Sequence, residues 1–199
     1  MSFKEKRKFR LFEHLPIIVR AARSFLYLRL FKKKNGMNFK FKERIMLAVT
    51  EVNGCQMCSY VHTKLALSAG LSMDDIQELL SGELVGVPKE ESLGVLFAKD
   101  YAFNKEKIDA DFYQKLVDTY DVRKARAILG VVEMITMTNA MGLGLGYLKR
   151  TLTLKHVKGS NVFNEVLIPL STMVLFPLFL LLFLPYIPFY SAQFKNSLK

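Results

Sequence analysis

Cysteine is scarce in this sequence, and its scarcity excludes one class of protein at once. Only two cysteines occur among the 199 residues, and they stand three positions apart. Small secreted domains that cannot build a large core rely on several disulfides, and two neighbouring cysteines provide no such framework. The pair formed by Cys55 and Cys58 is therefore either redox-active or part of a metal site.

The N-terminal stretch does not have the pattern expected of a secretory signal. The apolar stretch from Leu15 to Phe31 is interrupted by three arginines, and no small-residue cleavage site follows it. We therefore expect the folded domain to face the cytoplasm.

No segment shows the sustained alternation of apolar and polar residues that is typical of a half-buried strand. Apolar residues recur at helical spacing instead, most clearly in the second half of the chain. Asn53-Gly54 is a natural helix break, and Ser72 followed by Asp75 resembles a capping box at a helix start. We predict an all-α fold. The expected helices cover residues 39–52, 55–69, 73–80, 91–103, 109–119 and 122–150.

Three alternating glycines, Gly142, Gly144 and Gly146, fall within the last of these helices. They do not indicate a phosphate-binding loop, because no strand precedes them and their spacing fits neither nucleotide fingerprint. We interpret them as positions of close helix packing.

Negative charge is rare in the first quarter of the chain. Residues 1–44 hold 14 Lys or Arg against three acids, whereas residues 45–199 hold 15 of each. Apolar residues interrupt the basic ones, a pattern that favours an amphipathic helix on a membrane surface over a nucleic-acid partner, with Pro16 in its first turn. The alternative is a solvated basic tail followed by a core helix. We assign residues 1–35 to this N-terminal segment.

Charge of either sign is absent from Val166 to Phe194. That length exceeds what a helix needs to cross the hydrocarbon core of about 30 Å, and prolines are better tolerated in membrane helices than in soluble ones. We predict a transmembrane segment over residues 166–194 after a helical domain over 36–158. More Lys and Arg precede the segment than follow it, which keeps the domain cytoplasmic. The alternative is an apolar tail that packs against the domain or a second subunit.

The residues from Cys55 to His62 carry the clearest chemical signal. On one helix, steps of three and then four residues place Cys55, Cys58 and His62 on the same face. A Cys-x-x-Cys pair at a helix start can cycle between dithiol and disulfide, because the helix dipole increases the fraction of thiolate. His62 can accept or deliver the proton of a cysteine.

This segment resembles the alkylhydroperoxidase D and carboxymuconolactone decarboxylase family. The resemblance rests on Glu43, Asn53-Gly54, the two cysteines and His62. It implies an all-helical domain that forms homo-oligomers with the site near a subunit contact. It further implies that Cys58 is the peroxidatic nucleophile, that Cys55 is the resolving thiol, and that Glu43 and His62 relay protons. Met57 departs from the peroxidase branch, which has a histidine there.

We therefore predict a membrane-associated thiol peroxidase or disulfide oxidoreductase. It would act on organic hydroperoxides, draw electrons from an external thiol and need no bound cofactor. Four alternatives remain open: two cysteines that are only small core residues, a non-catalytic interaction or redox-sensor protein, an acid–base enzyme of the decarboxylase kind, and a metal site that uses Cys55, Cys58, His62 and a carboxylate.

Other polar residues compete for roles near this motif. Glu51, four residues before Cys55, is the alternative to Glu43 as the acid. His14 and His156 lie in the basic and membrane-proximal segments, and we expect both to face solvent.

Overall fold

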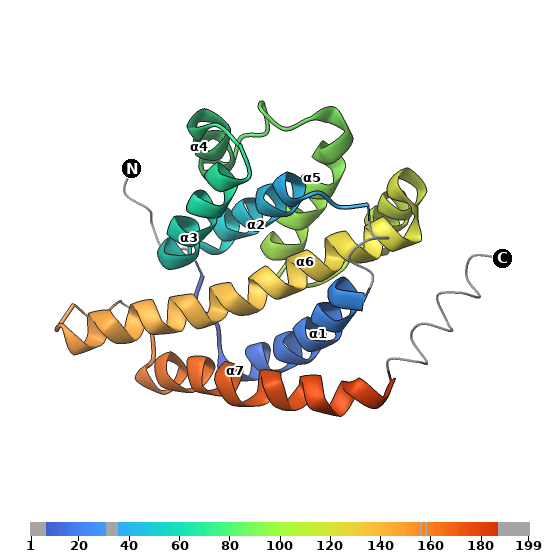
Figure 1. Ribbon diagram of the computed structural model, residues 1–199. Coiled ribbons are helices and arrows are strands. Elements are labelled where there is room, and N and C mark those ends of the chain that lie inside the picture. The colour runs from blue at the N-terminus through green and yellow to red at the C-terminus, as the bar shows by residue number, and fades with distance from the viewer. Residues whose placement is uncertain (1–6, 31–35, 156, 158, 187–199) are drawn as a thin grey trace.

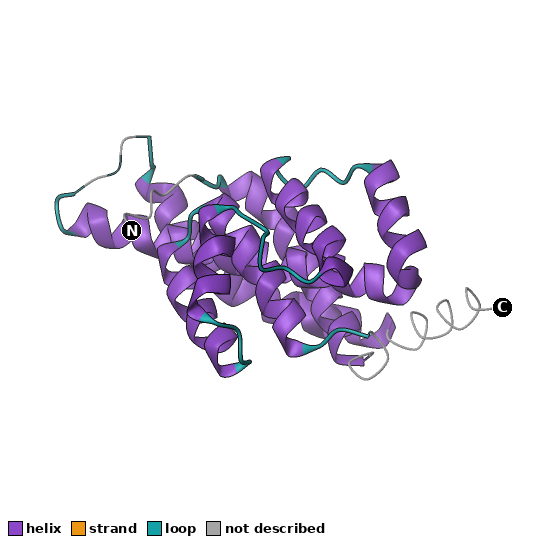
Figure 2. Ribbon diagram, turned by 90° about the horizontal axis from the view of Figure 1, so that it is seen from above, coloured by secondary structure: helices purple, strands orange, loops and turns teal. Residues whose placement is uncertain are grey.

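Helices are the regular secondary structure of the residues that the computed structural model describes, which are 7–30, 36–155, 157 and 159–186. No strand occurs among them, so the predicted all-α class is confirmed (Figures 1 and 2). The elements are α1 (Leu11–Leu30), α2 (Phe39–Asn53), α3 (Gln56–Ser68), α4 (Met73–Ser81), α5 (Lys89–Phe103), α6 (Ala110–Leu152), α7 (Val162–Phe183) and a short 3₁₀ turn η1 (Leu184–Tyr186).

Helix α6 is the central element of the fold. It contacts α1, α2, α3, α5 and α7, and Figure 1 shows α2–α5 on one side of it with α1 and α7 on the other. Two apolar clusters result. One is built mainly from α2, α4, α5 and the first part of α6, and the other contains both cysteines together with residues of α1, the later part of α6 and α7.

A break at Asp121 divides α6 into the two helices that the sequence predicts. The backbone of Asp121 has φ 72° and ψ 163°, outside the helical region. Its Oδ1 accepts hydrogen bonds from the backbone N–H groups of Arg123 and Lys124, at 2.7 and 3.0 Å, and so caps the second part. The predicted capping box of α4 is confirmed as well, because the side chains of Ser72 and Asp75 each bond the other's backbone N–H.

Helix α1 begins earlier than expected. It starts at Leu11, so Pro16 lies in the second turn and not in the first, which corrects the prediction for this residue. The helix packs one side against α6 and α7, with Ile17, Ile18 and Ala21 completely or almost completely buried. These side chains stabilise the second apolar cluster, so α1 has the burial of a core helix.

Helix α7 packs only one of its sides. Ile168 and Thr172 face α1 and α6, and the rings of Phe25 and Phe176 meet edge to face across the α1–α7 contact. The other side is an exposed apolar stripe, which we call the α7 stripe. It consists of Phe163, Val166, Leu170, Met173, Val174, Leu178, Leu181 and Leu182.

Two described helices are long and apolar enough to cross a membrane, α6 and the run from Val162 to Tyr186. Most of the apolar window of α6 is buried inside the protein, whereas most of the window in α7 is exposed. Residues 187–194 of the predicted transmembrane segment lie outside the described residues, so its full extent stays a prediction.

Candidate functional site

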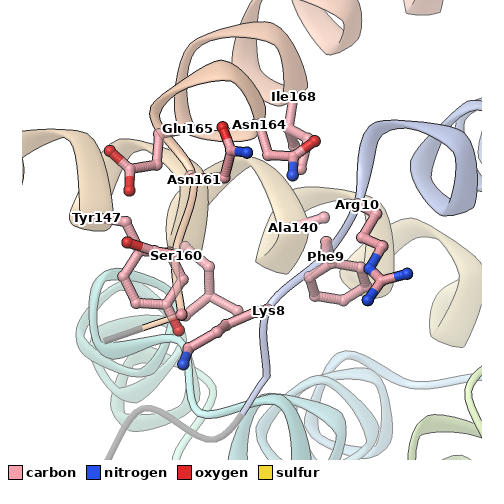
Figure 3. A pocket seen from close by; sticks show the side chains of 13 residues that line it. Lys8, Phe9, Arg10, Ala140, Tyr147, Ser160, Asn161, Asn164, Glu165 and Ile168 are labelled. Atoms are coloured by element: carbon pink, nitrogen blue, oxygen red, sulfur yellow. The ribbon is translucent and has the colours of Figure 1, made fainter. Parts of the chain in front are cut away.

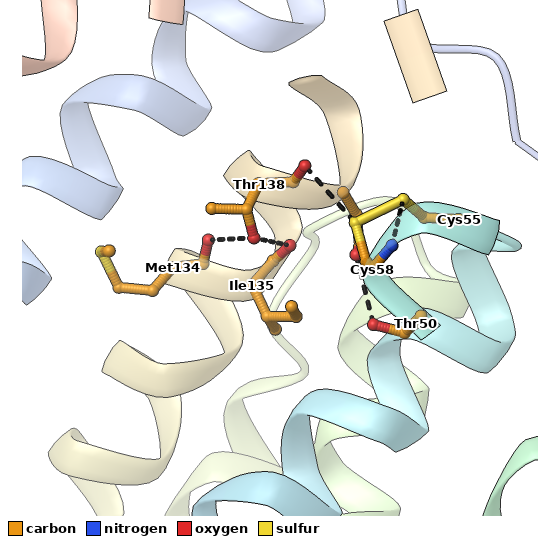
Figure 4. Close-up of a disulfide and its surroundings, with 7 residues drawn as sticks. Thr50, Cys55, Cys58, Met134, Ile135 and Thr138 are labelled. Atoms are coloured by element: carbon orange, nitrogen blue, oxygen red, sulfur yellow. Dashed lines mark hydrogen bonds between the residues drawn. A yellow bond between two sulfur atoms is a disulfide. The ribbon is translucent and has the colours of Figure 1, made fainter. Parts of the chain in front are cut away.

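The turn between α2 and α3 places the two cysteines. Gly54 ends α2 in a left-handed conformation, with φ 76°, and its N–H donates to the carbonyl of Thr50 at 2.8 Å. Cys55 is then the N-cap of α3, and its sulfur accepts the backbone N–H of Cys58 at 3.3 Å. Cys55 and Cys58 are joined as a disulfide (Figure 4). The sulfur pair therefore lies at the positive end of a helix.

The disulfide is buried against α6. Cys55 is 0% exposed and Cys58 is 6% exposed. The sulfur of Cys58 lies 3.6 Å from the carbonyl oxygen of Thr138, which Figure 4 shows on the α6 backbone. Around the pair pack apolar side chains from three other parts of the chain, including Phe9, Ile18 and Leu143. Reagents consequently cannot reach the sulfurs without some movement of their surroundings.

Gly142 allows α6 to approach the sulfurs so closely. A Cβ atom at this position would lie 2.7 Å from Cys55 Sγ and 2.9 Å from Cys58 Sγ, distances that real Cβ atoms do not show. At Gly144 a Cβ would lie 3.0 Å from the ring of Pro169 on α7. The prediction of close helix packing is thus confirmed for these two glycines. It is wrong for Gly146, where a Cβ would meet no atom within 4 Å.

Glu43 and His62 are also brought together. His62 Nδ1 and Glu43 Oε2 are 2.8 Å apart, and Glu43, on α2, is 2% exposed. A carboxylate accepts and does not donate, so it holds the proton on Nδ1 and leaves Nε2 as the nitrogen that exchanges a proton. Within the described residues no hydrogen bond joins His62 to either sulfur. His62 is nevertheless one helical turn from Cys58, on the same face of α3.

The competing acid, Glu51, points toward another helix. Its Oε2 lies 3.9 Å from Nζ of Lys99 on α5. Glu43 is therefore the carboxylate that reaches His62.

The prediction that His14 faces solvent is wrong. His14 is completely buried, and its Nε2 lies 2.6 Å from Oγ1 of Thr172 on α7. Because the Thr172 hydroxyl donates to the carbonyl of Ile168 at 2.9 Å, it accepts from His14, which fixes the Nε2–H tautomer. Desolvation lowers the pKa of His14 to about 4, so the ring is neutral at pH 7. His156 lies outside the described residues.

Sequence reasoning missed Arg7, which ties the N-terminal segment to the turn before Cys55. Its guanidinium binds both carboxylate oxygens of Glu106, at 2.6 and 2.8 Å, and the side-chain oxygen of Asn53 at 3.3 Å. The backbone N–H of Arg7 also donates to the carbonyl of Asn53, at 3.2 Å. These partners are 46 and 99 residues away along the chain, so no local pattern identifies them.

Two cavities flank the later part of α6. One is a groove of about 480 Å³ between the start of α3 and α6, which we call the α3–α6 groove; Met57, Gly142, Gly146 and Lys149 are among its lining residues. The other measures about 550 Å³ and lies between the N-terminal segment, α6 and the start of α7 (Figure 3). Lys8, Arg10 and the buried Glu165 contribute charged groups to this second cavity.

Among the described residues, no three His, Cys, Asp or Glu side chains are grouped as metal ligands. A cysteine pair that forms a disulfide is chemically able to undergo thiol–disulfide exchange.

Comparison with known proteins identifies one family. The model of the carboxymuconolactone decarboxylase family matches residues 19–93. This range includes most of α1 and all of α2, α3 and α4, together with both cysteines, Glu43 and His62. No curated protein and no solved structure matches the chain significantly.

Proposed function

We propose that this chain, whose residues 19–93 match the model of the carboxymuconolactone decarboxylase family, is a thiol oxidoreductase that reduces organic hydroperoxides. The observation that carries the proposal is the Cys55–Cys58 disulfide at the N-terminus of α3, one turn from a histidine that is bound to a buried carboxylate. A dithiol needs an oxidant, a proton path and a reductant to turn over. The site itself contains the cysteine pair and, in His62, a candidate group for the proton path.

The proposed cycle starts from the reduced pair. The Cys58 thiolate attacks one oxygen of the hydroperoxide, the O–O bond breaks, and the alcohol leaves with a proton delivered from His62. The resulting Cys58 sulfenic acid is attacked by the Cys55 thiolate, which forms the S–S bond and releases water. An external dithiol then reduces the disulfide by exchange and is itself oxidised.

Glu43 supports this cycle by acting on His62. Its carboxylate orients the imidazole, while the nitrogen that is not hydrogen-bonded to it exchanges protons with the reactants. We propose Cys58 as nucleophile, Cys55 as resolving thiol, His62 as proton donor and acceptor, and Glu43 as the positioning residue.

The test is to trap the sulfenic acid. The reduced full-length protein is mixed with cumene hydroperoxide, and thiol loss and mass are followed in the wild type, Cys55→Ser and Cys58→Ser. We expect loss of two thiols in the wild type, a dimedone adduct on Cys58 in Cys55→Ser, and no adduct in Cys58→Ser. Thiols that persist at millimolar hydroperoxide would contradict the proposal.

The burial of the two sulfurs favours a second candidate, a redox sensor that forms the disulfide without sustained turnover. The two functions differ in stoichiometry. With excess hydroperoxide and dithiothreitol, an enzyme rapidly consumes many equivalents of hydroperoxide per protein, whereas a sensor consumes about one in the same time because its buried disulfide is reduced only slowly.

We further propose that the protein associates with a membrane through the α7 stripe, with the redox site on the cytoplasmic side. The packed side of α7 contacts α1, which carries Arg20, Arg23 and Arg29. Because charged residues are costly in the hydrocarbon core, a docked α7 would lie along the lipid interface, and crossing would require it to leave α1 and α6. Homo-oligomers and an external thiol reductant remain part of the proposal.

A further inference from the structure

The α3–α6 groove is adjacent to the disulfide but closed off from it. The wall of the groove includes Gly142, and a Cβ added at this residue would lie within 3 Å of both sulfurs. The methyl group of Met57 lies 3.2 Å from the same point. Met57 is also 46% exposed and lines the groove. The Met57 side chain is thus the cover between the groove and the sulfur pair.

A methionine suits such a cover. It has three rotatable bonds and no branch, so its thioether can turn aside at low cost without backbone movement. The disulfide is nearly inaccessible as it stands, and any reaction at the sulfurs requires a side chain to move. Met57 is the flexible one among the groups that meet over Gly142.

The groove has one apolar end and one basic end. Leu143 and Leu145 line it beside the cover, and Lys149 and Arg150 line it farther along α6. No carboxylate is among its lining residues. An occupant with a negative charge at one end and an apolar body therefore matches the groove in both charge and polarity.

The spacing of these groups sets the length of the occupant. Lys149 follows Gly142 by seven residues, which is about 10 Å along the axis of α6. Gly146 lies between them, and its open side provides the middle of the groove. An occupant that reaches from the sulfurs to Lys149 must therefore extend along about two turns of α6.

We infer that the α3–α6 groove admits fatty-acid hydroperoxides to the cysteine pair, with Met57 as the cover and Lys149 as the anchor for the carboxylate. This inference rests on the proposed peroxidase function and adds the substrate class. The reaction is the one given above, in which the hydroperoxide becomes the hydroxy acid, the cysteine pair becomes the disulfide and one water is released.

The first experiment compares rates of thiol loss in reduced full-length protein with hydrogen peroxide, linoleic acid hydroperoxide and its methyl ester, below their micelle concentrations. We expect the acid to react about tenfold faster than the ester in the wild type. Gly146→Leu should slow both lipid substrates about tenfold more than it slows hydrogen peroxide, because a side chain at this open position occupies the middle of the groove. Gly146→Ala is the matched control and should retain most of the lipid rate.

Charge is tested separately. Lys149→Gln should remove the preference for the acid over the ester, whereas Lys155→Gln, which removes the same charge outside the groove, should retain it. If the preference survives Lys149→Gln, or Gly146→Leu reacts with both lipids at the wild-type rate, the inference is overturned. Reaction of the same proteins with cumene hydroperoxide would then leave the proposed function standing.

A binding measurement provides a readout independent of turnover. Hydroxylinoleic acid is titrated calorimetrically into the oxidised protein, where no reaction can occur, and we expect binding in the wild type that is lost in Gly146→Leu. Absence of binding to the wild type would overturn the inference. The inference would also be overturned if analytical ultracentrifugation gave Gly146→Leu a different assembly mass from the wild type. That result would show that a second copy of the chain covers the groove. If no hydroperoxide oxidises the thiols, the proposed function fails, and with it the role of the groove in delivering substrate.

Discussion

Helices α6 and α7 both contain a long apolar window, but the two windows have opposite surroundings. Each contains a window apolar enough to cross a membrane, yet the window in α6 is mostly buried and the one in α7 mostly exposed. The buried part of α6 includes polar groups with partners, such as Glu133, which accepts from Ser24 and contacts Arg126. The exposed stripe of α7 is apolar throughout. Hydropathy measures how apolar the side chains of a helix are. Whether those side chains contact protein or lipid depends on the neighbouring elements.

The largest expected effect is a difference between the two helices in how much a substitution to alanine lowers the free energy of unfolding. Ile135 on α6 is 1% exposed and Leu181 on α7 is 64% exposed. We expect Ile135→Ala to lower the free energy of unfolding by about 2–5 kcal/mol, because it leaves a cavity in the core. Leu181→Ala should change it by less than about 0.5 kcal/mol, as exposed sites do. Urea unfolding measures both, and equal losses would show that the α7 stripe is covered.

Acid should weaken the contact between α1 and α7. The pKa of His14 is about 4 in the folded protein and about 6.5 when unfolded, so only the unfolded chain takes up this proton between those values. The stabilisation from a neutral His14 is fully present above pH 6.5 and is lost as the pH falls toward 4. At pH 5 we expect a loss of about 2 kcal/mol.

The control for this effect is His14→Gln, which can still donate to Thr172 but does not titrate. The difference between the wild type and the variant should depend on pH between 6.5 and 4, as measured by urea unfolding at each pH. Parallel curves would show that His14 is not the group responsible.

The contact between α6 and α7 can be tested at two neighbouring glycines. Gly144→Ala places a Cβ 3.0 Å from the Pro169 ring, and we expect it to destabilise the protein by about 1–3 kcal/mol through overpacking. Gly146→Ala meets nothing and should stabilise it by about 0.5–1 kcal/mol, because alanine favours the helix. Thermal unfolding of the two variants should therefore shift in opposite directions. If both variants shift in the same direction, α7 moves away from the added Cβ at Pro169 without a loss of stability.

The smallest change in stability is expected for polar substitutions in the α7 stripe. A variant with Leu170→Gln, Met173→Gln and Leu178→Gln should unfold at nearly the same urea concentration as the wild type. Its flotation with anionic lipid vesicles should nevertheless be much weaker, because less apolar surface can enter the interface. If the variant still floats with the vesicles, the membrane contact lies in another part of the chain.

Local patterns predicted much of the fold. The capping box at Ser72, the break after Asn53 and the separation of two helices near Asp121 each depend on residues close together in sequence, and all are confirmed. The approach of Glu43 to His62 was expected from the family resemblance alone, since the two are 19 residues apart.

Other features could not be predicted, because they depend on tertiary contacts. His14 is polar and lies beside charged residues in the sequence, yet α7, some 158 positions away, buries it. Pro16 gave no indication that α1 begins one turn earlier. The closeness of Gly142 to the sulfurs depends on how α6 crosses the start of α3, and no periodicity contains that information.

Few substitutions fit at Gly142 and Gly144, the two glycines that contact neighbouring elements. Gly142 faces the sulfurs and Gly144, two residues on, faces α7, so only the backbone of α6 separates the redox pair from the helix with the apolar stripe. Glycine is the smallest residue, and every substitution adds atoms where neighbouring atoms already stand. In a saturation library, few substitutions at positions 142 and 144 should give a folded protein. At position 146, in the next turn, many substitutions should still allow folding.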